Sequence, residues 1–418
     1  MTGASLVRGF ARTRLLPVRR VTALLGPAWI VMLADVDAPS VLTAAQGGSR
    51  YGYALLLPLF ILVPVLYLVQ ELTARLGAVS RLGHAALVRR HYGAGWAALS
   101  VASMAGVNLV AYLAEFAGIV LGASLVGIPA PMAVAGALLL HTLMVLTGSY
   151  RSFERAALLL SGALVAFVAV AITSDPHPGA VWAGLTSPQP FGAPGYGALV
   201  VATIGAVVMP WMLYFQQAAT VDKRLEVADL PAARRETLLG AVASELLMAA
   251  VVIAAATAMH LPAVGSSGAG SVLPAGFARM AHGPVTLLLA TGLVGASLLA
   301  AVVISLASAW GWAELLDRPR SLDLSPRRAP LFYAVYLLEV LPAAALVLVA
   351  RDLVALVIGA MVWNVVLLAV PLGFLVRMAA DRSILGPRAN GPVRTALSAA
   401  VAAGLVALGC AAALGMLG

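Results

Sequence analysis

The sequence contains few charged residues and a single cysteine. Asp, Glu, Lys and Arg make up 10% of its 418 residues, whereas 62% are hydrophobic. A soluble globular protein usually carries about 25% charged residues, so a mean hydropathy of +0.99 excludes a water-soluble globule. The lone Cys410 excludes both a disulfide framework and a cysteine-rich metal site.

The sequence also lacks the motifs of common enzyme classes. It has no His-Glu-x-x-His pair, no nucleophile elbow and no Walker motif, so we expect no enzyme activity and no cofactor. The net charge of +9 would favour nucleic-acid binding only if the charges gathered on one face. They lie in short segments between apolar blocks, which is typical of a protein that crosses a membrane several times. The expected partner is therefore the lipid bilayer and not a nucleic acid.

Long apolar blocks dominate the chain. A membrane-spanning helix needs about 20 apolar residues, and the sequence divides into eleven such blocks. We therefore predict an all-α membrane protein in which residues 23–418 form one transmembrane domain of eleven helices. Their approximate bounds are 23–48, 52–74, 94–127, 130–148, 153–174, 195–218, 237–260, 283–312, 331–350, 353–376 and 395–417.

The basic residues predict the orientation of these helices. If the N-terminus is cytoplasmic, all but three of the 26 Lys and Arg residues fall in cytoplasmic segments; the exceptions are Arg50, Arg279 and Arg351. Cytoplasmic loops of membrane proteins carry such an excess of positive charge. We therefore expect a basic cytoplasmic tail over residues 1–22, an external C-terminus and a location in the cell membrane.

Two blocks are interrupted by proline at mid-span. Pro39 follows two aspartates in the first block, and Pro210 follows Met209 in the sixth. Paired interruptions at matching positions of two halves point to a transport site near the bilayer midplane, because an unwound segment frees backbone carbonyls. The alternative is that each proline only kinks its helix. On the first interpretation, the two halves are about 23–174 and 195–376, followed by an extra helix at 395–417.

Acidic residues accompany the first interruption. Burying an aspartate at mid-span costs about 2.5–3.5 kcal/mol on insertion scales, so Asp37, directly before the break, is a predicted ligand. Asp35 faces the same cavity only if the backbone is unwound; otherwise it lies in the permeation path or caps a half-helix. Carboxylate, carbonyl and the hydroxyl of Ser40 suit hard cations, whereas the thioether of Met209 suits softer transition metals. These groups predict a site for a cation.

Other ionisable residues fall inside the predicted spans. Glu115 lies among small residues, where it either packs silently or relays protons and positions the ion. Glu245 and Glu339 are intramembrane acids without a motif of their own. His141 is expected to be packed and hydrogen-bonded, and Glu71 to be solvated at a span end.

Several stretches carry a family resemblance. Residues 26–28, 46–53, 113–116, 150–155 and 381–382 resemble motifs of the natural resistance-associated macrophage protein (Nramp) family of divalent metal transporters. In this resemblance Ala206 and Met209 stand where the family has its alanine carbonyl and methionine thioether ligands. The resemblance implies an eleven-helix fold of the LeuT type, with a 5+5 inverted repeat, broken helices one and six, and alternating access around one central ion. We expect the protein to function as a monomer.

The sequence also departs from the family pattern. Ser40 stands in place of an asparagine, Trp211 in place of a histidine implicated in proton traffic, and Tyr112 in place of an acid one turn before Glu115. An arginine pair of helix nine is replaced by an apolar run, and Asn364 lies near the position of a helix-ten glutamine. Residues 34–38, 210–212 and 295–300 resemble more closely the Nramp-related branch that includes magnesium transporters.

These patterns predict a secondary transporter of divalent metal cations with weak or no proton coupling. Mn²⁺ is the expected ion, and Fe²⁺ and Mg²⁺ are further candidates. One alternative is an Nramp-related Mg²⁺ transporter that carries a partly hydrated ion; another is an amino-acid or organic-cation transporter on the same fold. The predicted metal ligands are Asp37, Ser40, Ala206, Met209, Asp35 and Asn364, and the predicted coupling or pathway residues are Glu115 and Trp211.

Overall fold

The computed structural model describes residues 26–146, 148–259, 269–350 and 353–415, apart from the side chains of 269–272 and 353–355. Within these ranges all regular structure is helical. The fold class predicted from the sequence is thus confirmed. The predicted basic tail at residues 1–22 lies outside the described residues.

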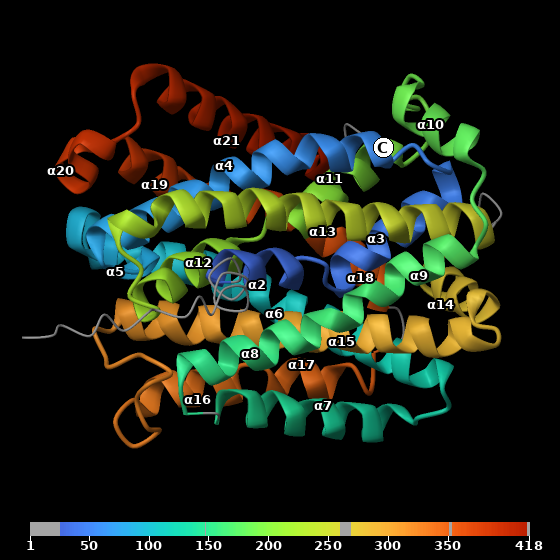
Figure 1. The fold of residues 1–418 in the computed structure, drawn as a ribbon, viewed down its shortest axis with the longest axis horizontal. Helices are drawn as coiled ribbons and strands as arrows, with labels where there is room; N and C mark the ends of the chain where they lie inside the picture. The colour runs from blue at the N-terminus through green and yellow to red at the C-terminus, as the bar shows by residue number, and fades with distance from the viewer. Residues whose placement is uncertain (1–25, 147, 260–268, 351–352, 416–418) are drawn as a thin grey trace, which may run out of the picture.

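The helices run mainly along one direction of the molecule (Figure 1). They are α2 (Pro27–Ala34), α3 (Ala38–Tyr51), α4 (Leu56–Ser80), α5 (His84–Tyr92), α6 (Ala94–Leu125), α7 (Ala130–Val145), α8 (Tyr150–Ser161), α9 (Val165–Thr173), α10 (Pro178–Thr186), α11 (Tyr196–Val207), α12 (Pro210–Asp222), α13 (Leu230–Ala258), α14 (Ala269–Met280), α15 (Pro284–Leu315), α16 (Pro330–Leu338), α17 (Leu341–Leu346), α18 (Leu353–Leu367), α19 (Ala369–Ala380), α20 (Arg382–Leu385) and α21 (Pro392–Ala413), with short 3-10 turns η1 (Gly162–Leu164), η2 (Val227–Asp229) and η4 (Gly386–Arg388).

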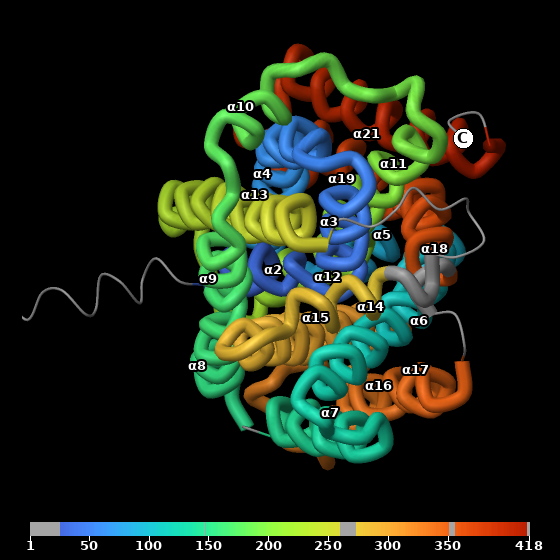
Figure 2. Tube along the Cα trace, turned by 90° about the vertical axis from the view of Figure 1, so that its right-hand side faces the viewer, coloured from blue at the N-terminus to red at the C-terminus, as the bar shows by residue number. Residues whose placement is uncertain are grey.

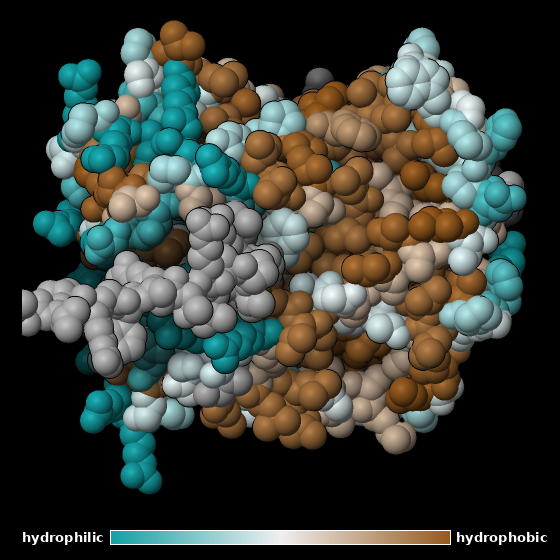
Figure 3. Space-filling view, in the orientation of Figure 1, coloured by the Kyte–Doolittle hydropathy of each residue, from teal (hydrophilic) through white to brown (hydrophobic). Residues whose placement is uncertain are grey.

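The helices correspond to the eleven predicted spans. In the described part of the chain, eight helices are long and apolar enough to cross a membrane. The pair α2 and α3 forms a ninth, bent by 48° at its break, and two shorter apolar helices cover Ala130–Val145 and Pro330–Leu346. Hydrophilic side chains gather at the two ends of the molecule, while hydrophobic side chains cover much of the surface between them (Figure 3). Such a belt is what a bilayer requires.

The broken helices lie at the centre of the bundle. Seen along the helices, α2, α3 and α12 are surrounded by α13, α15, α9, α6 and α18, while α7, α16 and α17 form one outer side (Figure 2). The division into two repeats, at about 23–174 and 195–376, stays a prediction. A further helix, α14 (Ala269–Met280), lies between the seventh and eighth predicted spans.

The unbroken helix α13 runs beside both halves of the first broken helix. A carboxylate oxygen of Glu236 near its start accepts hydrogen bonds from the backbone N–H groups of Gly26 (2.6 Å) and Trp29 (2.8 Å), which satisfies the N-terminus of α2. Further along, Gly240 lies so close to Met32 that an added Cβ would be 2.9 Å from its Cγ. Still further, Gly48 of α3 lies against the carbonyl of Val252. Helix α13 and the broken helix formed by α2 and α3 therefore run parallel to each other.

Candidate metal site

The first break has a local cause in the sequence Asp-Ala-Pro-Ser. Asp37 has an extended backbone (φ −99°, ψ 179°), and its side chain accepts a hydrogen bond from the backbone N–H of Ser40 at 2.9 Å, as an N-cap residue does. Pro39 follows within the first turn of α3, where its missing N–H leaves no helical bond unmade. Because residue 39 is a proline, the carbonyl of Asp35 has no N–H donor four residues on.

The second break repeats this arrangement between α11 and α12. Val208 and Met209 are extended, and Pro210 begins α12. The carbonyl of Ala206 has no donor four residues on, because that residue is Pro210. The preceding carbonyl, that of Gly205, accepts a hydrogen bond from the side-chain amide of Asn364 on α18. The paired interruptions predicted from the sequence are therefore present, and Asn364 contacts one of them.

The packing brings the two breaks together. The helix before the second break, α11, packs against α3, while α12, after that break, packs against α2. Two broken helices packed in this way run antiparallel, so that their interruptions lie at the same level of the bundle. The site residues predicted on them, Asp35, Asp37, Ser40, Ala206 and Met209, are all buried.

Glu115 on α6 also reaches the first break. Its Oε2 accepts a hydrogen bond from the backbone N–H of Ala38 at 3.1 Å, at the N-terminus of α3. One turn further along α6, a Cβ on Gly118 would be 2.7 Å from the Cβ of Ala38 and 2.3 Å from Oγ of Ser297. This small-residue contact allows α6 to approach closely enough for the carboxylate to reach the broken backbone.

Met209 and Trp211 are in contact with each other. The indole Nε1–H of Trp211 donates to Sδ of Met209 at 2.8 Å, and both side chains are buried. A thioether sulfur is a weak acceptor with two lone pairs, so one lone pair stays available for a soft cation. The predicted pathway residue is thus positioned next to a predicted ligand.

Several buried oxygens around the breaks have no hydrogen-bond donor among the described residues. Most buried polar atoms in folded proteins have a partner, and carboxylate, hydroxyl and amide oxygens without one are suited to coordinating a cation. In the described part of the chain, no group of three or more His, Cys, Asp or Glu side chains could hold a metal ion, so a site here needs neutral donors as well. The unpartnered atoms are both Oδ atoms of Asp35, Oδ2 of Asp37, Oγ of Ser40, Oε1 of Glu115 and Oδ1 of Asn364.

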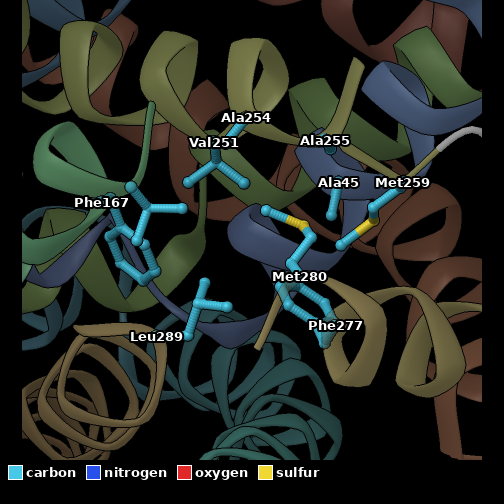
Figure 4. Close-up of a pocket in the computed structure, with 10 residues that line it drawn as sticks. Ala45, Phe167, Val251, Ala254, Ala255, Met259, Phe277, Met280 and Leu289 are labelled. Atoms are coloured by element: carbon cyan, nitrogen blue, oxygen red, sulfur yellow. The ribbon is translucent and has the colours of Figure 1, made fainter. Parts of the chain in front are cut away.

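Apolar side chains pack against α3 around Ala45. Around Ala45 they leave a cavity of only about 10 Å³, roughly the minimum for a single water molecule. These side chains come from α9, α13 and α15 and from the segment containing α14 (Figure 4). The labelled lining includes Phe167, Val251, Phe277 and Leu289. The packing around Ala45 is therefore tight.

Two residues outside the site follow or contradict the sequence-based expectation. His141 is packed as expected, because its Nε2 lies 2.8 Å from Oγ of Ser305 and its ring stacks on Tyr336 at 4.3 Å. The expectation that Glu71 is solvated is wrong. Its side chain is 1% exposed and contacts Arg75, Arg234 and Arg394, because three arginines from different parts of the sequence converge on it.

The sequence alone did not identify two contacts that shape the site. Nothing in the sequence around Gly205 indicates that its carbonyl accepts a hydrogen bond from Asn364, because the two residues are 159 positions apart. Glu236, which caps α2, is 210 positions from Gly26. A sequence pattern reveals a capping acid only when the acid lies within a few residues of the helix start that it caps.

The sequence is similar, over residues 28–414, to the family described as natural resistance-associated macrophage protein-like. A divalent metal cation transporter MntH from Granulibacter bethesdensis is 30% identical over 56% of this chain and 55% of the relative. A second, from Ralstonia nicotianae, is 27% identical over 89% of this chain and 86% of the relative. The matched part of this chain covers about half the length of the Granulibacter bethesdensis relative.

The fold is similar to that of a solved transporter. A manganese transporter of Eremococcus coleocola, crystallised with an aromatic bis-isothiourea substituted compound, superposes with a TM-score of 0.74 over 96% of this chain and 89% of that chain. The sequence identity is 19%, so this likeness concerns the fold. It agrees with the LeuT-like, eleven-span arrangement expected from the sequence.

Proposed function

The chain belongs to the natural resistance-associated macrophage protein-like family, and on that premise we propose that it is a secondary transporter of divalent metal cations. Relatives named divalent metal cation transporters, and a solved manganese transporter with the same fold, support this proposal. The same comparisons support a transporter in preference to an enzyme. We propose a location in the cell membrane with the N-terminus inside, the C-terminus outside and a monomer as the working unit.

The observation that carries the proposal is the pair of neighbouring breaks with unpartnered oxygens. We propose that the transported ion binds between Asp37 and Ser40 on one side and the Ala206 carbonyl and Met209 sulfur on the other. Asp35 supplies a second carboxylate, and Asn364 supplies an amide oxygen while its nitrogen holds the second break. Alternating access then opens this site to each side in turn.

We propose Mn²⁺ as the principal ion, with Fe²⁺ and Mg²⁺ also accepted. A thioether contributes little to a hard ion, so Met209 favours transition metals over Mg²⁺ and Ca²⁺. The small Ser40 side chain and a second carboxylate favour an ion that keeps some of its water, as Mg²⁺ prefers. An Nramp-related Mg²⁺ transporter is therefore the second candidate, supported by these two residues.

Ion uptake by the protein reconstituted in liposomes tests this assignment. Asp37→Ala removes a charged ligand, and a loss of about 1.4 kcal/mol of binding free energy already lowers affinity tenfold, so Mn²⁺ uptake should fall about tenfold or more. Met209→Ala should reduce Mn²⁺ uptake and leave Mg²⁺ uptake largely intact. Asp175→Asn is the matched control, because this exposed aspartate lies outside the site and has a left-handed backbone (φ 54°) that asparagine tolerates.

Each result separates the candidates. Uptake by Asp37→Ala equal to that of the control would remove the site. Equal Mn²⁺ and Mg²⁺ losses in Met209→Ala would argue against the sulfur as the selective ligand. An amino-acid or organic-cation transporter would show saturable uptake of such a substrate that is insensitive to Met209→Ala.

A further inference from the structure

Three arginines converge on one glutamate, Glu71, where α4, α13 and α21 meet. The arginines in contact with its carboxylate are Arg75 of α4 (3.4 Å), Arg234 of α13 (2.9 Å) and Arg394 of α21. Helix α4 ends, and α13 and α21 begin, at the same end of the molecule (Figure 1, left). Three positive charges and one negative charge leave this arginine cluster with a net charge of +2. The cluster therefore lacks negative charge.

The arginine cluster also lacks hydrogen-bond acceptors. Arg75 is 2% exposed, and its two Nη atoms donate to the carbonyl of Arg388 and to Oδ1 of Asn390. Its Nε and the side-chain nitrogen of Asn390 are buried and have no acceptor among the described residues. A buried donor without an acceptor costs free energy. Both the charge and the donors thus indicate that an anion binds at this cluster.

Two of the arginines present donors at the surface. Among the described residues, Arg234 donates only through Nε and Arg394 only through Nη2, each to a different oxygen of Glu71. Their side chains are 43% and 37% exposed. Because the two guanidinium groups bind the same carboxylate, they lie side by side with their other N–H groups free. Guanidinium groups bind phosphate oxygens through such paired donors, and both arginines lie near helix N-termini, where the dipole favours a negative charge.

An apolar surface runs from these arginines towards the middle of the membrane. On α13, Leu238, Val242 and Leu246 follow Arg234 at intervals of four residues, which places them along one side of the helix. They are 45%, 37% and 53% exposed. Hydrophilic side chains are concentrated at this end of the molecule, and the hydrophobic surface begins beside them (Figure 3, left). A ligand that extends from the arginines along α13 therefore needs an apolar body.

The apolar surface leads to a cavity of about 180 Å³ between α4 and α13. Both carboxylate oxygens of Glu245 are buried, so this residue presents its methylene groups to the cavity, and the rest of the lining is apolar. Pro64 is seven residues from Glu71, and Val242 is eight residues from Arg234, which is about 10–12 Å along a helix. Half of the hydrocarbon core of a bilayer is about 15 Å thick, so the cavity lies among the acyl chains of the same leaflet. The lining residues are Phe60, Val63, Pro64, Val242, Glu245 and Leu246.

We propose that Arg234 and Arg394 bind the phosphate of an anionic glycerophospholipid, and that one of its acyl chains lies along α13 and enters the cavity beside α4. The lipid belongs to the leaflet at the end of the molecule where α13 and α21 begin. A net charge of +2 favours a headgroup without a positive charge, because the ammonium group of a zwitterionic lipid is repelled by the cluster. A free phosphate ion satisfies the arginines but makes no use of the apolar surface and the cavity.

Thermal unfolding of the purified full-length protein in an uncharged detergent, at physiological salt, tests this site. The probes are phosphatidylglycerol, phosphatidylcholine with the same acyl chains, and glycerol 3-phosphate, which has the phosphate and no acyl chain. At ten times its dissociation constant, phosphatidylglycerol should raise the Tm by about 2 °C. At the same concentrations, phosphatidylcholine should raise the Tm less, and glycerol 3-phosphate should leave it unchanged.

Arg234→Gln and Arg235→Gln are a matched pair of variants. Both remove one positive charge from the exposed start of α13, but only Arg234 contacts Glu71. Titration of the Tm shift should show an apparent Kd for phosphatidylglycerol about tenfold higher or more in Arg234→Gln, and nearly unchanged in Arg235→Gln. Val63→Phe fills the cavity without altering any charge and should also weaken this binding. It tests the site even if Arg234→Gln fails to fold.

The contrary results are equally specific. Equal Tm shifts with the two lipids in the wild type, or equal losses of affinity in Arg234→Gln and Arg235→Gln, would overturn the site in favour of general attraction to a basic surface. A shift with glycerol 3-phosphate equal to that with phosphatidylglycerol would replace the lipid by a free phosphate. No ion transport is measured, so failure of the proposed function would leave the lipid site intact.

Discussion

The hydrogen bond from the Trp211 indole to the Met209 sulfur (2.8 Å) predicts a change in metal preference on substitution. Trp211→Phe keeps an aromatic ring and removes the N–H donor, so both sulfur lone pairs become available to a metal ion. A neutral hydrogen bond is worth about 0.5–1.5 kcal/mol, so the apparent affinity for Mn²⁺ should rise about two- to tenfold while that for Mg²⁺ stays the same. Competition of Mn²⁺ and Mg²⁺ for uptake measures this ratio.

The double variant Trp211→Phe with Met209→Ala is the control for this prediction. Without the sulfur, loss of the indole N–H frees no lone pair for the metal ion. The ratio of Mn²⁺ to Mg²⁺ affinity should then equal that of Met209→Ala alone. A gain in Mn²⁺ preference that survives in the double variant would assign the effect to ring size instead of the hydrogen bond.

His84 predicts a pH dependence of stability. It begins α5, outside the spanning helices; it is buried beside the Tyr214 ring at 4.8 Å, and neither ring nitrogen has a partner among the described residues. Burial lowers its pKa from 6.5 to about 4. The folded state therefore favours the neutral ring, so this contribution to stability is complete above pH 6.5 and is lost as the pH falls towards 4.

His84→Phe should remove this dependence. The ring stays in place against Tyr214, but it cannot take up a proton. Between pH 7 and pH 5 the wild type should lose about 2 kcal/mol of stability through His84, and the variant should lose correspondingly less. Thermal unfolding at the two pH values measures the difference, and parallel Tm changes in the two proteins would contradict the assignment.

At the scale of helices, the Glu71 carboxylate ties three elements together. It lies on α4 with Arg75, and it contacts Arg234 near the start of α13 (2.9 Å) and Arg394 near the start of α21. Removing one partner of a buried ion pair commonly costs about 3–5 kcal/mol. Glu71→Gln should therefore lower the Tm clearly, by loosening α21 from the remainder of the bundle.

The pair Glu226 and Arg81 provides the matched control. Both side chains are at least half exposed and their charged atoms are 3.0 Å apart, and exposed ion pairs contribute about 0–1 kcal/mol. Glu226→Gln should leave the Tm almost unchanged. Equal effects of the two substitutions would mean that the buried cluster does not hold α4, α13 and α21 together.

The helices themselves could largely be predicted from the sequence, because hydropathy over about 20 residues is a local property. The interruptions at Pro39 and Pro210 were predictable for the same reason, since a proline removes the donor for a carbonyl four residues earlier. The burial of Glu71 was not predictable. It depends on arginines from α13 and α21, and their convergence follows only from the packing of the bundle.

For the whole molecule, the main functional prediction concerns protons. A relay through the membrane needs a chain of titratable groups, and this chain has Trp211 and Tyr112 where the resemblance leads one to expect a histidine and an acid. We therefore predict metal uptake with little or no accompanying proton flux. Liposomes loaded with a pH-sensitive dye measure it directly during Mn²⁺ uptake. Acidification equal to the metal flux would contradict the prediction, and empty liposomes supply the control.

The candidate site illustrates what remains beyond the sequence at this scale. Asp37, Ser40 and Met209 could be selected because they flank a proline in an apolar span. Asn364 could be selected only by resemblance, and its contact with the Gly205 carbonyl requires that α11 and α18 be packed together. Glu245 had no motif, and its burial follows only from the packing of α13 in the bundle.

The straight course of α13 beside both halves of the broken helix limits how the protein can move. Swinging α2 away from its other half would break the two hydrogen bonds that Glu236 accepts from Gly26 and Trp29 and would pull Met32 off Gly240. Contacts with α13 therefore hold the angle between α2 and α3 fixed on one side. A rigid-body rotation of α13 together with α2 and α3, relative to α6 and α15, therefore costs less free energy.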